Sequence, residues 1–349
     1  MRSLNRSISW VAKHALPPRL RSYGEGLTGG SLFRRLNQPQ FSTLEKLVRH
    51  TTALASRLRG IRFFKFAAHS KFGQPFTFPC YSSNVFPSNF ASVAAAAWNN
   101  ARNVEGYIGE REFHALCMLA AAAPAGGVTV EIGSFKGKST IGLASISQAF
   151  NLGEVISIDP HNAPSETDPD LDETGTSFAD FETSLTQAGL RDRVEAHRTP
   201  SRDAAVGWNR PIRFLWIDGD HTYLGAKLDF DLFMPFLIEG GIVALHDTLH
   251  EFEGPIRVFV EDMLRSDQFG PAGLLHTIGW AQYRPREGAL FRKERERLAR
   301  KAARLIPLVA NGRQVLGLTR MRYKLQCARV PHQILTPAEF SALLMSTAR

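Results

Sequence analysis

Acidic and histidine side chains follow two separate apolar runs of the sequence. Asp218, Asp220 and His221 come after LWI, and His246 and Asp247 come after IVAL. Histidine exchanges a proton near neutral pH, so we favour His221 as a general base and keep His246 as the alternative. Paired carboxylates can hold a hard cation or accept hydrogen bonds from amides and water. Asp220 is either a second ligand or a turn residue. The structural alternative for His221 is a hydrogen bond that fixes the loop after Asp218.

A second set of chemistry-bearing residues lies in VEIGSFKGKST. A P-loop needs four residues between its glycines, and only three separate Gly133 from Gly137, so that interpretation fails. The other interpretation is a strand-to-helix turn on which a nucleoside-type ligand approaches the backbone. It requires an acid about 20 residues further on to hold ribose hydroxyls. Asp159 stands 22 residues after Gly137 and satisfies this requirement.

The elements that position these residues alternate between helix and strand. Apolar spacing and Gly/Pro punctuation predict helices over 110–123, 139–150, 178–188 and 226–237, and strands over 128–132, 155–158, 194–197, 214–217 and 242–245. In this prediction Gly240 and Gly241 end the last helix, whose residues Lys227, Asp229 and Asp231 form an exposed face. Such alternation predicts an α/β fold, a doubly wound parallel sheet with helices on both faces. Ligands of such sheets bind at the carboxyl ends of the strands, where the polar residues above converge.

Charge divides the 349 residues into three parts. Residues 1–104 hold 15 Lys and Arg against 2 acids, residues 105–285 hold 13 against 27, and residues 286–349 hold 14 against 4. We therefore expect an N-terminal extension and cap segment, a central domain, and a basic helical C-terminal extension. An acidic body between basic arms argues against a nucleic-acid binder. The arms leave an anionic membrane surface open as a partner.

Location is less constrained by the sequence. Cys80, Cys117 and Cys327 form no CxxC pair, which favours a reducing compartment, and no apolar run reaches the length of a membrane span. We expect a cytoplasmic protein, with peripheral membrane attachment through the basic arms as an alternative. The first 24 residues are basic and lack acids, so a mitochondrial presequence stays open beside a simple basic arm.

The stretch over 105–285 resembles class I S-adenosylmethionine-dependent methyltransferases, in the branch of small-molecule O-methyltransferases that includes the Methyltransferase_24 type. The residues that carry this resemblance are VEIGSFKGKST with Asp159, FADFETSLTQAGLRDRVEAHRTPS, and LWIDGDHTYLGAKLDFDLFMPFLIEGGIVALHDT. It implies a Rossmann-like, mostly parallel sheet of seven strands. It also implies an enzyme with S-adenosylmethionine as cofactor.

The resemblance assigns cofactor roles residue by residue. The implied cofactor-binding residues are Glu131, Gly133, Ser134, Gly137, Ser139, Asp159, Ser201 and Asp218. Asp159 would accept from the ribose hydroxyls, Ser201 would lie near the adenine, and Ser139 would lie at a helix start beneath the cofactor. Helix capping is the alternative for Asp159, and a plain tight turn is the alternative for the two glycines.

The resemblance also bears on a metal. Metal-dependent relatives place an aspartate where Asp218 stands, an Asp–Asn pair where His246–Asp247 stands, and a lysine base where His221 stands. This chain departs from that pattern at His246 and at His221, so Mg²⁺ at Asp218 and Asp247 is one of two interpretations. The other is a metal-free carboxylate pair. We expect Tyr223 to pack.

We expect the methyl acceptor to be a hydroxyl group of a small molecule. Among small molecules, a saccharide, a glycoside or another natural product is the preferred substrate. Loop 160–177 and the aromatic segment 60–92 are the expected specificity elements, and enzymes of this branch are often homo-oligomers. The alternative function is an interaction protein of nucleotide-binding fold whose basic arms bind nucleic acid or an anionic membrane.

Overall fold

A sheet of seven strands forms the centre of the computed structural model, which describes residues 86–162, 176–310 and 315–346. The strands are β1 (Val128–Ile132), β2 (Val155–Ile158), β3 (Val194–His197), β4 (Ile212–Ile217), β5 (Leu237–Leu245), β6 (Phe269–Leu275) and β7 (Ile278–Tyr283). Their order is β3-β2-β1-β4-β5-β7-β6. Strand β7 runs in the opposite direction to the other six strands. This arrangement confirms the predicted doubly wound, mostly parallel sheet.

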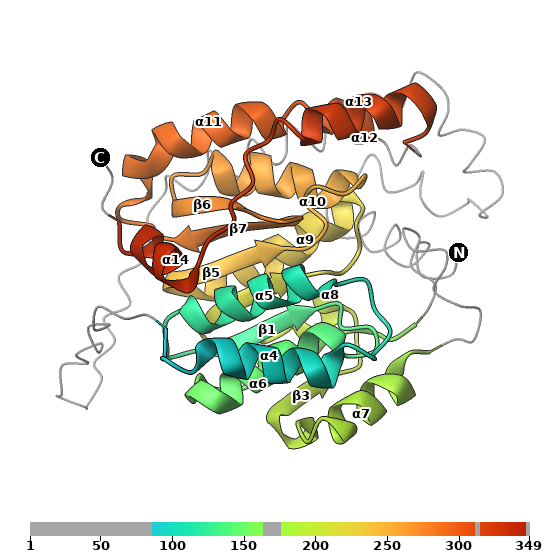
Figure 1. Ribbon diagram of the computed structural model, residues 1–349. Helices are drawn as coiled ribbons and strands as arrows, with labels where there is room; N and C mark the ends of the chain where they lie inside the picture. Colours follow the sequence, from blue (N-terminus) through green and yellow to red (C-terminus); the bar gives the residue numbers. More distant parts are fainter. Residues whose placement is uncertain (1–85, 163–175, 311–314, 347–349) are drawn as a thin grey trace, which may run out of the picture. The chain divides into compact units, whose positions relative to one another are not determined.

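Helices cover both faces of the sheet because alternate strand residues point to opposite sides. On β4, Phe214 and Trp216 face one apolar cluster, whereas Leu215 and Ile217 face the other. The first cluster takes in α4 (Phe90–Ala101), α5 (Glu110–Ala122), α6 (Lys138–Phe150), α7 (Phe178–Gln187) and α14 (Pro337–Leu344). The second takes in α9 (Tyr223–Phe233), α10 (Glu253–Val258), the π-helix η5 (Phe259–Leu264), α11 (Arg292–Ala302), α12 (Ile306–Val309) and α13 (Gly317–Cys327). Figure 1 shows α4, α5 and α6 over the β1 side, with α11 beyond the edge strand β6.

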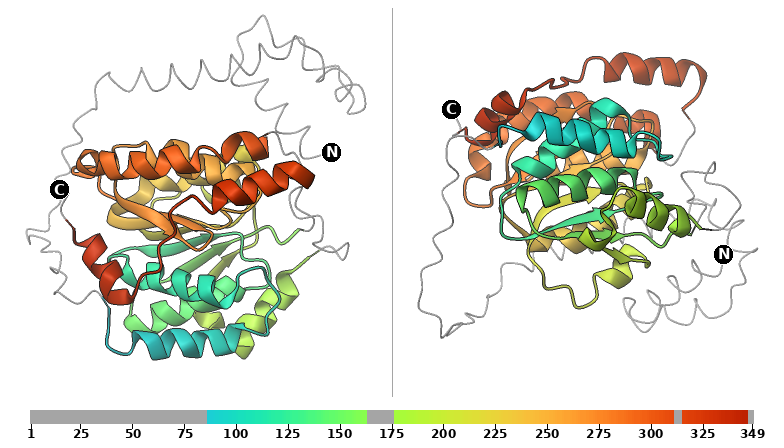
Figure 2. Two further views of the ribbon diagram at one scale, coloured as in Figure 1. Left: turned by 45° about the horizontal axis from the view of Figure 1, so that its top comes forward. Right: turned by 60° about the horizontal axis from the view of Figure 1, so that its bottom comes forward.

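Both predicted extensions contribute to this core where they are described. Helix α4, from the N-terminal extension, buries Phe90, Ala94 and Ala97 against the first cluster. The C-terminal extension is helical as predicted, and both views of Figure 2 show its helices against the body. All described residues belong to one compact unit, Pro79–Arg349. No helix in the described ranges has the length and apolar character of a membrane span.

A buried arginine anchors the C-terminal extension. The Arg295 side chain of α11 is almost fully buried and donates to the carbonyl oxygens of Leu264 at 3.0 Å, Ser266 at 2.6 Å and Gly288 at 2.8 Å. Burial lowers the pKa of its guanidinium to about 10, which still leaves it charged at neutral pH. These bonds fix α11 against the sheet edge.

The prediction for residues 226–241 was partly wrong. Helix α9 ends at Phe233, and Pro235 lies in a 3₁₀ turn, because proline cannot continue the helical ladder. Gly240 and Gly241 lie inside β5 rather than at a helix end. They form an irregularity in the pairing with β4, where Ile212 pairs with Leu237 and Phe214 already pairs with Ile242.

Candidate functional site

The Gly-rich turn joins β1 to α6 at the carboxyl edge of the sheet. Gly133 and Gly137 have φ angles of +82° and +89°, a backbone region that favours glycine. A Cβ atom at Gly133 would lie 2.1 Å from the backbone oxygen of Asp218. Glycine therefore allows the ends of β1 and β4 to meet, and it brings the turn directly beside Asp218.

The Asp159 carboxylate braces this turn from the end of β2. It accepts backbone N–H bonds from Ser134 and Phe135, each at 2.8 Å, and from His161 at 2.7 Å. The Ser134 hydroxyl adds a longer bond to Oδ2 at 3.4 Å, so Oδ2 accepts three bonds, whereas Oδ1 accepts only the His161 amide. Because each carboxylate oxygen has two lone pairs, Oδ1 keeps one acceptor position. The structure thus joins Asp159, Ser134 and the glycines, which the sequence had grouped.

Glu131 and Ser139 lie deeper than the turn. The Ser139 hydroxyl donates to the Glu131 carboxylate at 2.6 Å, and the Thr140 hydroxyl donates to its other oxygen at 2.5 Å. Burial raises the pKa of Glu131 to about 8, although both hydroxyls act in the opposite direction. The two residues predicted to bind the cofactor are therefore bonded to each other beneath the turn, where they fix the start of α6.

Ser201 starts the short helix α8 (Ser201–Ala204) and donates to Asp229 of α9 at 2.5 Å. The exposed face predicted for α9 was wrong at this position, because Asp229 is only 5% exposed. Burial raises the pKa of Asp229 to about 6, partly offset by the Ser201 hydroxyl. Lys227 and Asp231 do form an ion pair on the outer side of α9.

Three predicted side chains converge at the carboxyl ends of β4 and β5. His221 Nε2 lies 3.4 Å from Asp247 Oδ2 and 3.7 Å from Asp218 Oδ1. Its ring stacks on Phe252 with the ring centroids 4.4 Å apart, which fixes the plane of the imidazole. One ligand atom from each of Asp218, His221 and Asp247 lies within 4.8 Å of the others, a spacing that a metal ion could occupy. We refer to these three residues as the acid–histidine cluster.

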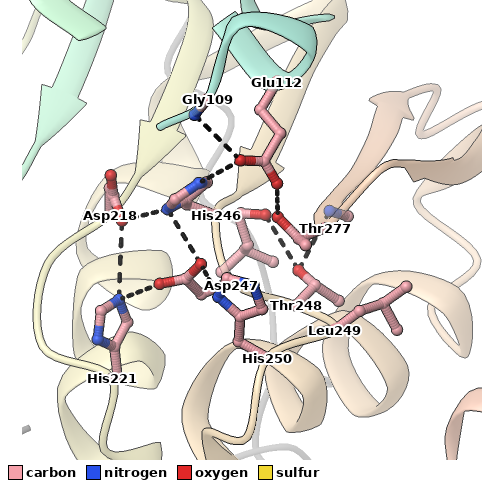
Figure 3. Close-up of polar contacts among 12 residues, drawn as sticks. Gly109, Glu112, Asp218, His221, His246, Asp247, Thr248, Leu249, His250 and Thr277 are labelled. Carbon is pink, nitrogen blue, oxygen red and sulfur yellow. Dashed lines mark hydrogen bonds and ion pairs between the residues drawn. The ribbon is translucent and has the colours of Figure 1, made fainter. Parts of the chain in front are cut away.

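His246 occupies a different place, between Asp218 and Glu112 (Figure 3). Its Nδ1 lies 3.0 Å from Asp218 Oδ1 and 3.3 Å from Asp247 Oδ1, and its Nε2 lies 3.8 Å from Glu112. Burial lowers the pKa of His246, but the charges of Asp218 and Asp247 outweigh it and raise this pKa well above the ordinary value. The two carboxylates therefore favour the protonated form of His246.

Residues 130–248 match the family model of a methyltransferase domain. The chain contains a methyltransferase domain. The match spans the Gly-rich turn, Asp159 and the acid–histidine cluster, and it confirms the resemblance to S-adenosylmethionine-dependent enzymes.

Solved structures similar to the methyltransferase include two O-methyltransferases of low identity. The O-methyltransferase from Bacillus cereus in complex with SAH is 18% identical, with a TM-score of 0.37, and the match covers 56% of this chain and 91% of that one. The calicheamicin methyltransferase CalS11 is 15% identical, with a TM-score of 0.38, and the match covers 61% of this chain and 99% of that one. At TM-scores below 0.5 these likenesses add no detail about the substrate.

The sequence analysis missed His250, whose Nδ1 lies 2.6 Å from Asp247 Oδ1 of the acid–histidine cluster. It also missed Glu112, which lies 3.8 Å from His246, and its partner Thr277. Glu112, in the first turn of α5, accepts a hydrogen bond from the Thr277 hydroxyl in the turn between β6 and β7. Burial raises the pKa of Glu112, but the neighbouring His246 and the hydrogen bond from Thr277 outweigh it and lower the pKa to about 2. A glutamate in a first helical turn is an ordinary capping residue, so no local signal marks it as a partner of His246.

A pocket of about 590 Å³ is lined in part by Glu112 and Thr277. Its lining residues are Gly109, Glu110, Arg111, Glu112, Leu249, His276, Thr277, Cys327 and His332. Its walls thus come from the start of α5, the β6–β7 turn and the segment after α13.

The remaining predicted residues have structural places. Asp220 accepts the backbone N–H of Thr222 at 2.8 Å, the bond of a turn residue. Tyr223 packs as predicted, with the Arg257 guanidinium 3.5 Å from its ring centroid. Most of loop 160–177 and of segment 60–92 lies outside the described residues, and so do residues 1–24 and Cys80.

Proposed function

We propose that the methyltransferase transfers the methyl group of S-adenosylmethionine to a hydroxyl of a small molecule, with a saccharide, glycoside or other natural product preferred. The observation that carries the proposal is the contact between the Gly-rich turn and the acid–histidine cluster. Gly133 meets the backbone of Asp218, so a cofactor on the turn would present its methyl group beside His221. Methyl transfer needs this proximity because the acceptor oxygen must lie in line with the methyl carbon.

The cofactor would lie over the turn, with the free acceptor position of Asp159 taking a ribose hydroxyl. Ser134 and the backbone of Gly133 and Gly137 would contact the methionine and ribose parts. Asp218 would lie near the sulfonium, where a carboxylate stabilises positive charge. Glu131 and Ser139 would act from below, by fixing the helix that follows the turn.

His221 is the base we assign to the reaction. The acceptor O–H would give its proton to the imidazole while the oxygen electron pair forms the O–CH₃ bond and the C–S bond breaks. The products are a methyl ether and S-adenosylhomocysteine. His246 suits this role less well, because the carboxylates beside it favour its protonated form, which has no lone pair to accept a proton.

A divalent cation is a second candidate for the same cluster, supported by the spacing of its ligand atoms. Asp218, Asp247 and His221 would hold it, and this donor set suits Mn²⁺ or Zn²⁺ as well as Mg²⁺. Such an ion lowers the pKa of a bound hydroxyl. His221 would then be a ligand rather than the base, so the two roles exclude each other.

The acceptor would enter through the 590 Å³ pocket, whose lining residue Glu112 lies 3.8 Å from His246, the neighbour of Asp218. Its exposed side chains Glu110, Arg111 and His332 suit a polar acceptor rather than a wholly apolar one.

The test is transfer of a labelled methyl group to a panel of glycosides and phenolics, with and without EDTA. We expect the activity to fall in His221→Gln and to persist in His197→Gln. His197 is the last residue of the edge strand β3. Activity that EDTA leaves unchanged supports the base role, and activity that returns only with added Mg²⁺ or Mn²⁺ supports the ligand role. Full activity of His221→Gln would exclude both roles, and no transfer to any hydroxyl by an enzyme that binds the cofactor would contradict O-methylation.

A further inference from the structure

Helix α13 carries a row of apolar side chains on its outer side. Leu318, Met321 and Leu325 are 70%, 63% and 54% exposed. Residues at i, i+3 and i+7 lie on one side of a helix, so these three form a continuous stripe. We call Leu318, Met321 and Leu325 the outer stripe. Leu316, just before the helix, extends the exposed apolar surface.

The opposite side of α13 is fixed to the body of the protein. Tyr323 is 2% exposed, and its hydroxyl donates to the carbonyl oxygen of His250. Arg320 bonds to Glu251 at 2.9 Å, and Cys327 Sγ lies 3.8 Å from the Leu249 carbonyl oxygen. Because these contacts hold the helix from below, the outer stripe cannot turn into the core without breaking them.

Cationic side chains border the outer stripe on both sides. Arg322 and Lys324 precede and follow the buried Tyr323, which places them on the two flanks of the helix between the anchor and the stripe. Both are exposed, and neither forms an ion pair within the described ranges. The whole C-terminal extension has 14 Lys and Arg against 4 acids.

We propose that α13 docks on an anionic membrane surface, with the outer stripe in the headgroup region and Arg322 and Lys324 among the lipid phosphates. An apolar stripe between cationic flanks is the arrangement of helices that lie in the plane of a membrane interface. Nucleic acid fits less well, because its phosphates would pair with the cations and leave the stripe in water. A second copy fits less well because two basic faces repel each other.

Docking through α13 would bring the proposed acceptor pocket close to the membrane. Cys327 ends α13 and lines that pocket, as does Leu249 beneath the helix. The lipid contact itself does not depend on the proposed reaction.

The test is flotation of the full-length protein with vesicles of phosphatidylcholine alone and with phosphatidylglycerol added. We expect binding to the anionic vesicles only, and weaker binding at high salt because salt screens the phosphate charges. The double variant Leu318→Glu and Met321→Glu should weaken the partition by at least about tenfold, since it removes apolar burial and adds charge repulsion. Arg322→Glu with Lys324→Glu should remove the preference for anionic vesicles.

Matched controls are Leu224→Glu, a leucine 79% exposed on α9, and Arg193→Glu beside β3. Both should leave vesicle binding unchanged, and all variants should retain the unfolding temperature of the parent chain. Absence of vesicle binding, or equal binding by parent and stripe variant, would overturn the proposal. Dimerisation that the stripe variant abolishes, without vesicle binding, would assign the surface to a second copy instead.

Discussion

The two halves of the methyltransferase site differ in how their polar groups are satisfied. In the half at β1 and β2, Asp159 accepts three backbone amides, and Glu131 accepts two hydroxyls in a fully buried position. In the half at β4 and β5, His221 meets its two carboxylates at 3.4 and 3.7 Å, longer than hydrogen bonds. In that second half Asp218 also contacts His246 at 3.0 Å and Asp247 contacts His250 at 2.6 Å. The first half is therefore a support, whereas the second places His221 at distances from two carboxylates that a further atom could bridge.

This difference separates the residues that stabilise the structure of the site from those that take part in the reaction. Residues that bond only to the protein interior should affect stability and cofactor affinity together. His221 and Asp247 of the acid–histidine cluster should affect the rate of methyl transfer while the cofactor still binds, whereas Asp218 should affect both. Each prediction below tests one side of this division.

The largest effect is expected for His221→Gln. Loss of a general base typically lowers the rate by about 10²–10⁴-fold, and glutamine keeps the size of the side chain without its basicity. Cofactor affinity, measured by calorimetry, should stay within about threefold of the parent chain. A proportional loss of rate and cofactor affinity would instead place His221 among the supporting residues.

Gly133→Ala should disturb the half of the site at β1 and β2. The added Cβ would lie 2.1 Å from the Asp218 carbonyl oxygen, and the φ of +82° is strained for alanine. We expect a loss of unfolding free energy of roughly 3 kcal/mol together with loss of cofactor binding. Gly189→Ala is the control, since its φ of +67° is also positive but nothing lies within 4 Å of its Cβ position. If the two variants behave alike in denaturant unfolding, the close approach to β4 is not the cause.

Glu131→Gln should change how stability depends on pH. The pKa of Glu131 is about 8 in the folded protein and near the ordinary 4.5 when unfolded, so only the folded state keeps the proton between these values. Stability therefore falls as pH rises from about 5 to about 8, by a few kcal/mol at most. The glutamine variant should lack this fall, so its stability relative to the parent chain rises over the same interval.

The control for this pH series is Glu110→Gln, an exposed glutamate of α5. Parallel stability curves for the parent chain and Glu131→Gln would show that Glu131 is ionised in the folded protein.

Much of the fold could be predicted because local signals coincide with its elements. The bounds of β1, β2 and β3 were predicted to the residue, since β1 and β2 are short, mostly apolar or β-branched runs and β3 alternates apolar and polar residues. The topology of a parallel sheet then placed Asp247, after β5, beside Asp218 and His221, which follow β4.

The errors arose where distant segments decide the outcome. Gly240 and Gly241 have the composition of a helix stop, yet their pairing with β4 places them in a strand. Asp229 has the spacing of an exposed residue, yet the hydroxyl of Ser201, 28 residues away, covers it. Glu112 and Thr277 lie 165 residues apart, and only the folded sheet brings them together.

The most direct test of the central claim is calorimetric titration of the full-length protein with S-adenosylmethionine, in the parent chain and in Asp159→Ala. Asp192→Ala, an exposed aspartate in the 3₁₀ turn before β3, serves as the control. We predict binding in the parent chain and the control, and an affinity lower by about tenfold or more in Asp159→Ala, because a charged hydrogen-bond acceptor is lost. A folded parent chain that takes up no S-adenosylmethionine would contradict the account.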